Sequence, residues 1–198
     1  MERRGDGGAR DQGPGTLRLF LAAFPSPEAQ AAAARACEAL RSPGDGVSWV
    51  KREHLHYTLR FLGEMGADGA RRAGEAAREA AAEHAPFAAA LGAFGCFPTA
   101  QRARVLWVGL AEGGEPLGAL ADSLEAALQR RGFGRADKPF AAHLTVGRVR
   151  VPADWSSKLA AAKAPEARFA VDRVRLMKST LSPRGSLYEA VSEARLGG

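Results

Sequence analysis

The alternation of apolar and polar positions along the chain predicts a series of strands and helices. An apolar strand is expected at 17–24. Ser26-Pro27-Glu28 then has the features of a helix start, with a capping hydroxyl, a proline at the first helical position and an acid in the first turn. The same reading predicts further strands at 47–50, 55–62, 87–94, 104–110, 140–150, 168–177 and 186–194, and helices at 27–41, 68–84, 116–131 and 153–162. Several strands follow one another directly, which favours an α+β fold over a regular parallel βαβ array.

The domain organisation follows from composition. Residues 1–15 contain five glycines and one proline, so we expect a disordered tail, followed by a single domain over 16–198. No apolar run reaches the roughly 20 residues that span a bilayer, and the N-terminus lacks the apolar core of a secretory signal. We therefore expect a cytoplasmic protein without a membrane partner. No heptad pattern is present, and we expect a monomer.

The charge of the chain changes the choice of partners. The formal net charge is +6, and it resides in the part of the chain that is expected to fold. A basic globular surface suits an anionic partner such as a nucleic acid, although an ordinary solvated basic surface explains the charge equally well. Two cysteines, Cys37 and Cys96, form no CxxC pair, so we expect buried free thiols rather than a zinc or redox site.

One short pattern occurs twice. It is HYTL at 56–59 and HLTV at 143–146, both of the form His-x-Thr-apolar, both on predicted strands, and one in each half of the chain. Because side chains alternate between the two faces of a strand, His56 and Thr58 share one face, and so do His143 and Thr145. If the two strands approach each other, two imidazoles and two hydroxyls line one cleft.

This set of groups suits phosphoryl chemistry without a metal or other cofactor. One imidazole can activate water while the other donates a proton to the leaving oxygen, and the hydroxyls can bind phosphate oxygens. Arg148 could neutralise the charge that develops. Its odd spacing from His143 places it on the opposite face of a regular strand, so a bulge or a strand end near Gly147 is required.

The other histidines have simpler interpretations. His54 is expected at the edge of the site, supporting His56. The i, i+2 spacing of these two histidines could also hold a metal, but no convincing third ligand is visible. His84 lies at the end of an alanine-rich helix, where a cationic side chain is favourable.

The doubled motif and its surroundings resemble the 2H phosphoesterase superfamily and, within it, the RNA 2',3'-cyclic phosphodiesterases, also called 2'-5' RNA ligase-like proteins. The resemblance covers residues 17–196. It rests on these segments, in family order: RLFLA (18–22), LHYTLRFLGE (55–64), FP (97–98) with RVLW (104–107), KPF (138–140) through Arg148, and KSTL (178–181) with Gly185 and Tyr188. The chain departs from the family at Ala142, where proline is usual, which suggests a slightly looser entry into the second motif.

The resemblance implies a fold of two pseudo-symmetric lobes, with antiparallel sheets flanked by helices around a central cleft. It implies that His56 protonates the departing 3' oxygen of an RNA 2',3'-cyclic phosphate end, that His143 activates water, and that Thr58, Thr145 and Arg148 hold the phosphate. The product would carry a 2'-phosphate, and the reverse reaction would make a 2'-5' linkage. Two alternatives stay open: a phosphodiesterase for a small cyclic nucleotide or nucleotide sugar, and a non-catalytic protein that binds RNA ends.

Overall fold

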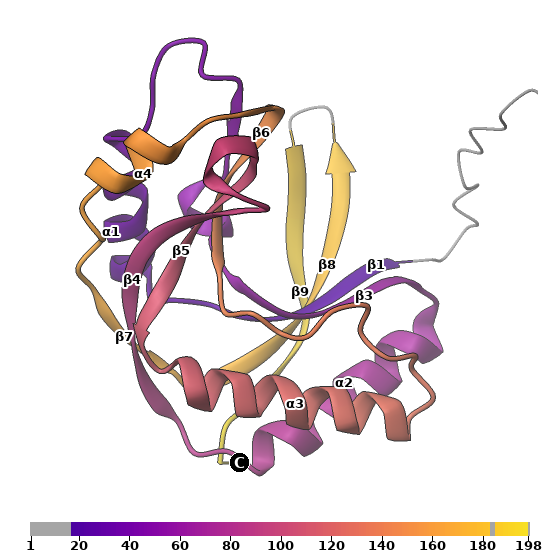
Figure 1. Ribbon diagram of the computed structural model, residues 1–198. Coiled ribbons are helices and arrows are strands. Elements are labelled where there is room, and N and C mark those ends of the chain that lie inside the picture. The colour runs from indigo at the N-terminus through magenta and orange to yellow at the C-terminus, as the bar shows by residue number, and fades with distance from the viewer. Residues whose placement is uncertain (1–16, 183–184, 198) are drawn as a thin grey trace, which may run out of the picture.

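The computed structural model describes residues 17–182 and 185–197, and its elements follow the predicted α+β order (Figure 1). The expected tail at 1–15 lies outside the described residues. The strands are β1 (Leu17–Ala23), β2 (Val47–Trp49), β3 (Tyr57–Met65), β4 (Phe87–Phe97), β5 (Ala103–Glu112), β6 (Leu144–Ala153), β7 (Arg168–Val171), β8 (Arg173–Ser182) and β9 (Gly185–Arg195). The helices are α1 (Pro27–Glu38), α2 (Ala67–Ala82), α3 (Gly114–Arg130) and α4 (Ser156–Ala161), with short 3₁₀ turns η1 (Arg52–His54) and η2 (Ala100–Arg102).

The strands form one antiparallel sheet in the order β7-β4-β5-β6-β3-β1-β8-β9. The short strand β2 lies off this path and pairs with β6 at Gly147, Arg148 and Val149. In the middle of the sheet, β3 and β6 are joined through a single residue pair, Tyr57 and Leu144. The sheet therefore divides into two halves. Figure 1 shows β4, β5 and β6 rising on one side and β8 and β9 on the other, and the expected two-lobed arrangement is confirmed.

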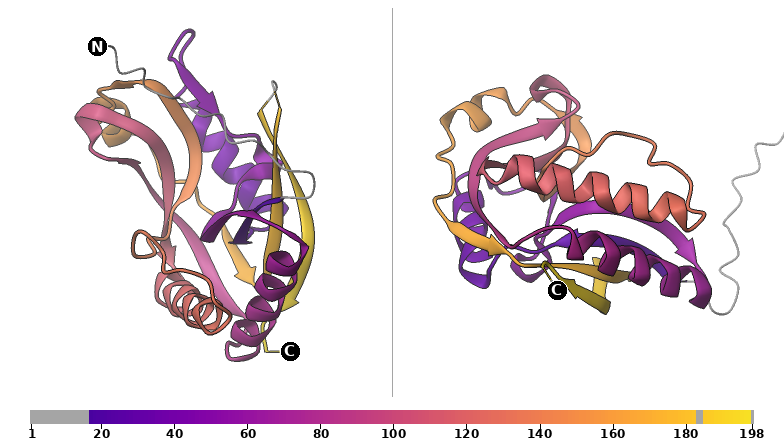
Figure 2. Two further views of the ribbon diagram at one scale, coloured as in Figure 1. Left: turned by 90° about the vertical axis from the view of Figure 1, so that its right-hand side faces the viewer. Right: turned by 90° about the horizontal axis from the view of Figure 1, so that it is seen from below.

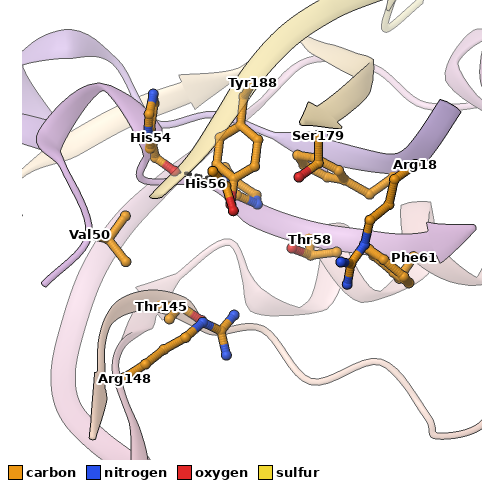
Figure 3. A pocket seen from close by; sticks show the side chains of 12 residues that line it. Arg18, Val50, His54, His56, Thr58, Phe61, Thr145, Arg148, Ser179 and Tyr188 are labelled. Carbon is orange, nitrogen blue, oxygen red and sulfur yellow. Dashed lines mark hydrogen bonds between the residues drawn. The ribbon is translucent and has the colours of Figure 1, made fainter. Parts of the chain in front are cut away.

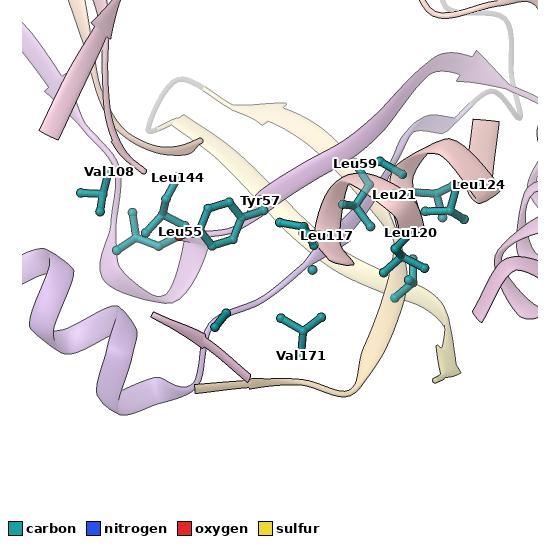
Figure 4. Packing of buried hydrophobic residues seen from close by; sticks show 14 of the residues in the cluster. Leu21, Leu55, Tyr57, Leu59, Val108, Leu117, Leu120, Leu124, Leu144 and Val171 are labelled. Carbon is teal, nitrogen blue, oxygen red and sulfur yellow. The ribbon is translucent and has the colours of Figure 1, made fainter. Parts of the chain in front are cut away.

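The main cluster of buried hydrophobic residues is built from the strands and from helices α1, α2 and α3. Helices α2 and α3 run beside each other, as the two rotated views show (Figure 2). Helix α3 contributes buried residues at helical spacing (Leu117, Leu120, Leu124 and Leu128), and they pack with residues of the middle strands (Figure 4). Helix α1 begins as predicted, because the Ser26 hydroxyl accepts a hydrogen bond from the amide of Ala29 at 3.3 Å.

Three differences from the predicted elements bear on the fold or on the site. The strand predicted at 168–177 is two strands, β7 and β8, because the chain crosses at Asp172 from the edge of one half, beside β4, to the other half, beside β1. The helix expected from 68 to 84 begins at Ala67 with Gly66 as its cap, and Asp68 instead forms ion pairs with Arg71 and Arg72 in the first turns.

The third difference concerns the strands that carry the histidines. Strands β3 and β6 begin at Tyr57 and Leu144, each one residue after its motif histidine rather than before it. The carbonyl oxygens two residues before each histidine, those of His54 and Ala141, contact the imidazole Nδ1 atoms.

Two other expectations concern burial and membranes. Cys37 is buried as expected, but Cys96 is only half-buried, because it lies near the end of β4 where the sheet opens to solvent. Among residues 17–182 and 185–197, no helix is both long and apolar enough to cross a bilayer.

Candidate active site

The fold brings the two His-x-Thr motifs together at the junction of the two halves. Tyr57 and Leu144, the paired residues, are 1% and 0% exposed and point into the core. Continuing this antiparallel register by one residue places His56 opposite Thr145 and Thr58 opposite His143. Because neighbouring residues of a strand alternate between faces, these four side chains share the face that is turned away from the core.

A cavity of about 390 Å³ opens on this face between the two halves (Figure 3). Strands β1, β3, β8 and β9 supply one wall, and β6 supplies the other. The lining residues are Arg18, Phe20, Val50, His54, His56, Thr58, Phe61, Thr145, Arg148, Ser179, Ser186 and Tyr188. His143 is not among them, although its register position is beside Thr58, and its ring packs edge-on against Phe97 with 5.1 Å between the ring centroids.

Both motif histidines are oriented by the same kind of hydrogen bond, from the ring to a backbone carbonyl. The Nδ1 of His56 bonds to the carbonyl oxygen of His54 at 2.7 Å, and the Nδ1 of His143 bonds to the carbonyl oxygen of Ala141 at 2.7 Å. A carbonyl oxygen only accepts, so Nδ1 carries the hydrogen in both rings. The Nε2 of each imidazole is therefore the nitrogen that can accept or donate a proton in the site.

Aromatic rings surround His56. Phe20 stacks on it with 4.9 Å between ring centroids, Phe24 is tilted at 5.4 Å, and Tyr188 meets it edge-on at 5.4 Å. The pKa of His56 is lowered to about 4, mainly because of this desolvation and also because of the positive charges of His54, Arg148 and His143, while the hydrogen bond to the His54 carbonyl opposes the shift. These surroundings therefore keep His56 neutral at pH 7.

A buried hydrogen bond positions the segment before His56. Gln30 of α1 is 8% exposed, and its Nε2 donates to the carbonyl oxygen of Leu55 at 2.9 Å. A buried carbonyl without a hydrogen-bond partner lowers the stability of the fold, so this contact holds the segment before β3 against α1. The His54 side chain also belongs to the site, with its ring 4.9 Å from that of Tyr188.

The required bulge is present in β6. Leu106 of β5 pairs with Gly147, whereas the next residue, Trp107, pairs with Thr145, so Val146 is the extra residue. Arg148 consequently lines the same cavity as Thr145 despite its odd spacing. Gly147 suits the bulge, because a Cβ there would come within 2.8 Å of Val47 Cγ1 on β2.

Several residues of the cavity lining could not be predicted from the two His-x-Thr motifs alone. Arg18 and Phe20 come from β1, and Ser179, Ser186 and Tyr188 come from β8 and β9. The family resemblance includes Arg18 and Tyr188 without a role. Alternation along β1 indicates that Arg18 and Phe20 share a face, but nothing local to the sequence indicates that this face borders His56.

The remaining histidine lies outside the cavity. The Nε2 of His84 contacts the Ser123 hydroxyl at 2.9 Å, which joins the end of α2 to α3. In the part of the chain that the structure describes, no three His, Cys, Asp or Glu side chains gather in a way that could hold a metal ion.

Comparison with known proteins places this geometry in a family. Residues 25–182 match the model of the 2'-5' RNA ligase superfamily. Two curated relatives named RNA 2',3'-cyclic phosphodiesterase are similar over most of their length. The one from Thermotoga maritima is 31% identical over 92% of this chain and 97% of its own, and the one from Archaeoglobus fulgidus is 40% identical over 73% and 81%.

Solved structures share the fold. A crystal structure of a protein from Thermus thermophilus superposes with a TM-score of 0.80 at 29% identity, covering 92% of this chain and 99% of that one. The structure of E. coli LigT complexed with 3'-AMP has the same fold, with a TM-score of 0.74 at 23% identity over 91% and 98%. The match to the family model and the similarity to these relatives show that the chain belongs to the 2'-5' RNA ligase superfamily.

Proposed function

We propose that this chain is an RNA 2',3'-cyclic phosphodiesterase that hydrolyses the cyclic end to a 2'-phosphate without a metal. The observation that carries the proposal is the pairing of Tyr57 with Leu144, which sets both His-x-Thr motifs on one face of adjacent strands. The named activity of the relatives from Thermotoga and Archaeoglobus supports the same reaction.

In the proposed reaction, the Nε2 of His143 takes a proton from water as the water oxygen bonds to phosphorus. The bond between phosphorus and the 3' oxygen breaks, and His56 donates its Nε2 proton to that oxygen. The 2' oxygen keeps the phosphate. Arg148 and the hydroxyls of Thr58 and Thr145 stabilise the charge on the non-bridging oxygens, which grows in the transition state.

The role of His56 as the acid requires that it be protonated, whereas its burial and its positive neighbours lower its pKa to about 4. A bound phosphodiester supplies a negative charge among the cationic groups that oppose this proton. It also offers an oxygen to which the protonated Nε2 can donate. Substrate binding therefore raises the pKa of His56, and the proton is acquired together with the substrate.

The same displacement can run with another nucleophile. With the 5'-hydroxyl of a second RNA in place of water, attack on the cyclic phosphate forms a 2'-5' linkage and again releases the 3' oxygen. We therefore propose RNA ligation as a second reaction of the same site. Incubating an RNA that has a cyclic phosphate end with an RNA that has a 5'-hydroxyl end tests it, and the measured product is a 2'-5' bond.

A product assay tests the main proposal. Wild type, His56→Ala and His143→Ala are incubated in EDTA with a short RNA that ends in a 2',3'-cyclic phosphate, and the terminal phosphate is identified. His84→Ala serves as the matched control, because it removes an imidazole outside the cavity. We expect a 2'-phosphate from wild type and from the control, and a loss of at least about a hundredfold in each motif variant.

Other outcomes separate the alternatives. Binding of the RNA with the cyclic phosphate left intact identifies a non-catalytic protein that binds RNA ends. Turnover of a small cyclic nucleotide or a cyclic nucleotide sugar, with none of the RNA, keeps the chemistry but changes the substrate. Loss of wild-type activity in EDTA contradicts the metal-free mechanism.

A further inference from the structure

The positive charge of the cavity lining is larger than a single phosphate with one negative charge requires. Its lining contains two arginines and two histidines, and none of its twelve residues is Asp or Glu. Arg148 comes from β6, and Arg18 comes from β1 in the opposite wall (Figure 3). Guanidinium groups on opposite walls, without a carboxylate between them, favour a ligand with more than one negative charge.

Arg18 has no ion-pair partner among the described residues. No carboxylate there lies within 4.0 Å of its guanidinium, although Glu64 is its cross-strand neighbour on β3. The guanidinium carbon lies 5.0 Å from the centre of the Phe61 ring. On the other side, Arg18 pairs in register with Ser179, whose hydroxyl also borders the cavity. A guanidinium beside a hydroxyl is a suitable pair of donors for phosphate oxygens.

The position of Arg18 along β1 sets its distance from the chemistry. Phe20 is the residue that stacks on His56, and Arg18 lies two residues further along the same face. Two residues of strand span about 7 Å. This displacement is comparable with the separation between neighbouring phosphates of a single RNA strand. Phe61, which is 45% exposed, offers an aromatic face at the same end of the cavity.

The neighbouring cavity is a poorer route for a polyanion. It shares His54 and Tyr188 with the active-site cavity, and its lining includes Glu53 and Asp172 as well as Arg173 and Arg175. Arg173 forms ion pairs with Asp172 and Glu193, and Arg175 forms one with Glu193, so both arginines already have carboxylate partners. Carboxylates therefore offset the arginines of that cavity, whereas neither arginine of the active-site lining has a carboxylate within 4.0 Å among the described residues. A bound strand is therefore directed toward Arg18.

Building on the proposed function, we infer that Arg18 and Ser179 bind a second phosphate, the diester on the 5' side of the terminal nucleotide, and that Phe61 stacks with the preceding nucleoside. The site then recognises an RNA end of at least two nucleotides. A nucleoside 2',3'-cyclic phosphate fills only the part beside the two motif histidines.

Three substrates with the same reacting group test this inference. They are adenosine 2',3'-cyclic phosphate, the same compound with a 5'-phosphate, and the dinucleotide adenylyl-(3'-5')-adenosine 2',3'-cyclic phosphate. The measured quantity is the ratio of kcat/KM for each longer substrate to that for the shortest. For wild type we expect both ratios to exceed one, because each longer substrate reaches Arg18.

The variants assign the parts of the subsite. Arg18→Gln should lower both ratios by about tenfold, as expected for the loss of a charged hydrogen bond, and Ser179→Ala should lower them by less. Phe61→Leu should lower only the dinucleotide ratio. Arg35→Gln, which removes an exposed charge on α1 outside the cavity lining, should leave both ratios as in wild type.

Salt dependence gives an independent readout. For the dinucleotide, the slope of log kcat/KM against log salt should be shallower in Arg18→Gln than in wild type by about 0.7, the value for one contact with a single-strand phosphate. Equal losses on all three substrates would place Arg18 at the reacting phosphate, and wild-type ratios near one would show that there is no second subsite. Either result overturns the inference while leaving the proposed function intact. Failure of wild type to hydrolyse any of the three overturns both.

Discussion

Burial of His56 makes a quantitative prediction about the stability of the free protein. In the unfolded chain the imidazole has a pKa near 6.5, and in the folded protein its pKa is about 4. Between these values the unfolded state binds a proton that the folded state does not. Stability is therefore complete above pH 6.5 and is lost as the pH falls, until the loss levels off near pH 4.

The size of the effect follows from the two pKa values. The full loss is about 3 kcal/mol, and about 2 kcal/mol of it falls between pH 7 and pH 5. Other groups also contribute to the pH dependence of stability, so the comparison that isolates this residue is wild type against His56→Gln. Glutamine does not titrate in this range and keeps a side-chain amide in the position of the ring.

The assay is urea denaturation of both proteins at pH 7 and pH 5, in buffers without phosphate. Wild type should lose about 2 kcal/mol more than His56→Gln over this interval. The NMR titration of the His56 ring in the folded protein provides a direct check. An equal loss in both proteins, together with a ring that titrates near pH 6.5, would refute the argument that the aromatic enclosure and its positive neighbours exclude the proton.

Four further predictions concern the site. Inorganic phosphate should raise the pKa of His56 in the NMR titration, because it supplies the missing negative charge; an unchanged pKa with phosphate bound would contradict the proposed acquisition of the proton. The pH profile of kcat/KM should be bell-shaped with its acidic limb near pH 4, and in kcat this limb should move to higher pH. Gly147→Ala should cost about 1–3 kcal/mol in thermal or urea unfolding and reduce activity through Arg148, because the added Cβ approaches Val47 Cγ1 at 2.8 Å. Gln30→Ala should lower stability by about 1–3 kcal/mol by leaving the buried Leu55 carbonyl unpaired, and wild-type stability in this variant would exclude the anchoring role.

Much of the local structure could be predicted from the sequence. The start of α1 at Ser26 and the apolar run of β1 follow from short-range chemistry, which acts in the same way in any fold. The alternation around each motif also holds, since Tyr57 and Leu144 are buried while the histidine and threonine beside each are turned to the cavity face. The requirement for a bulge near Gly147 was likewise predicted from a period of two.

The pairing of strands that are distant in the sequence could not be predicted from local patterns. No local pattern marks Asp172 as the point where the chain crosses between the halves of the sheet, because both flanking segments are apolar strands of the same kind. For the same reason, the wall supplied by β8 and β9, including Ser179 and Tyr188, could not be assigned to the cavity. Which strands become neighbours depends on the packing of the whole core.

The sequence by itself determined the chemistry that is available: two imidazoles, two hydroxyls and an arginine, in a repeated spacing that holds them to one face of each strand. Only the tertiary structure decided how these groups behave. It set the two motifs in register through Tyr57 and Leu144, turned Arg148 inward, and placed Phe20, Phe24 and Tyr188 around His56. Side-chain direction depends on backbone periodicity, which is local, whereas a pKa depends on the solvent and charges that other segments exclude or supply.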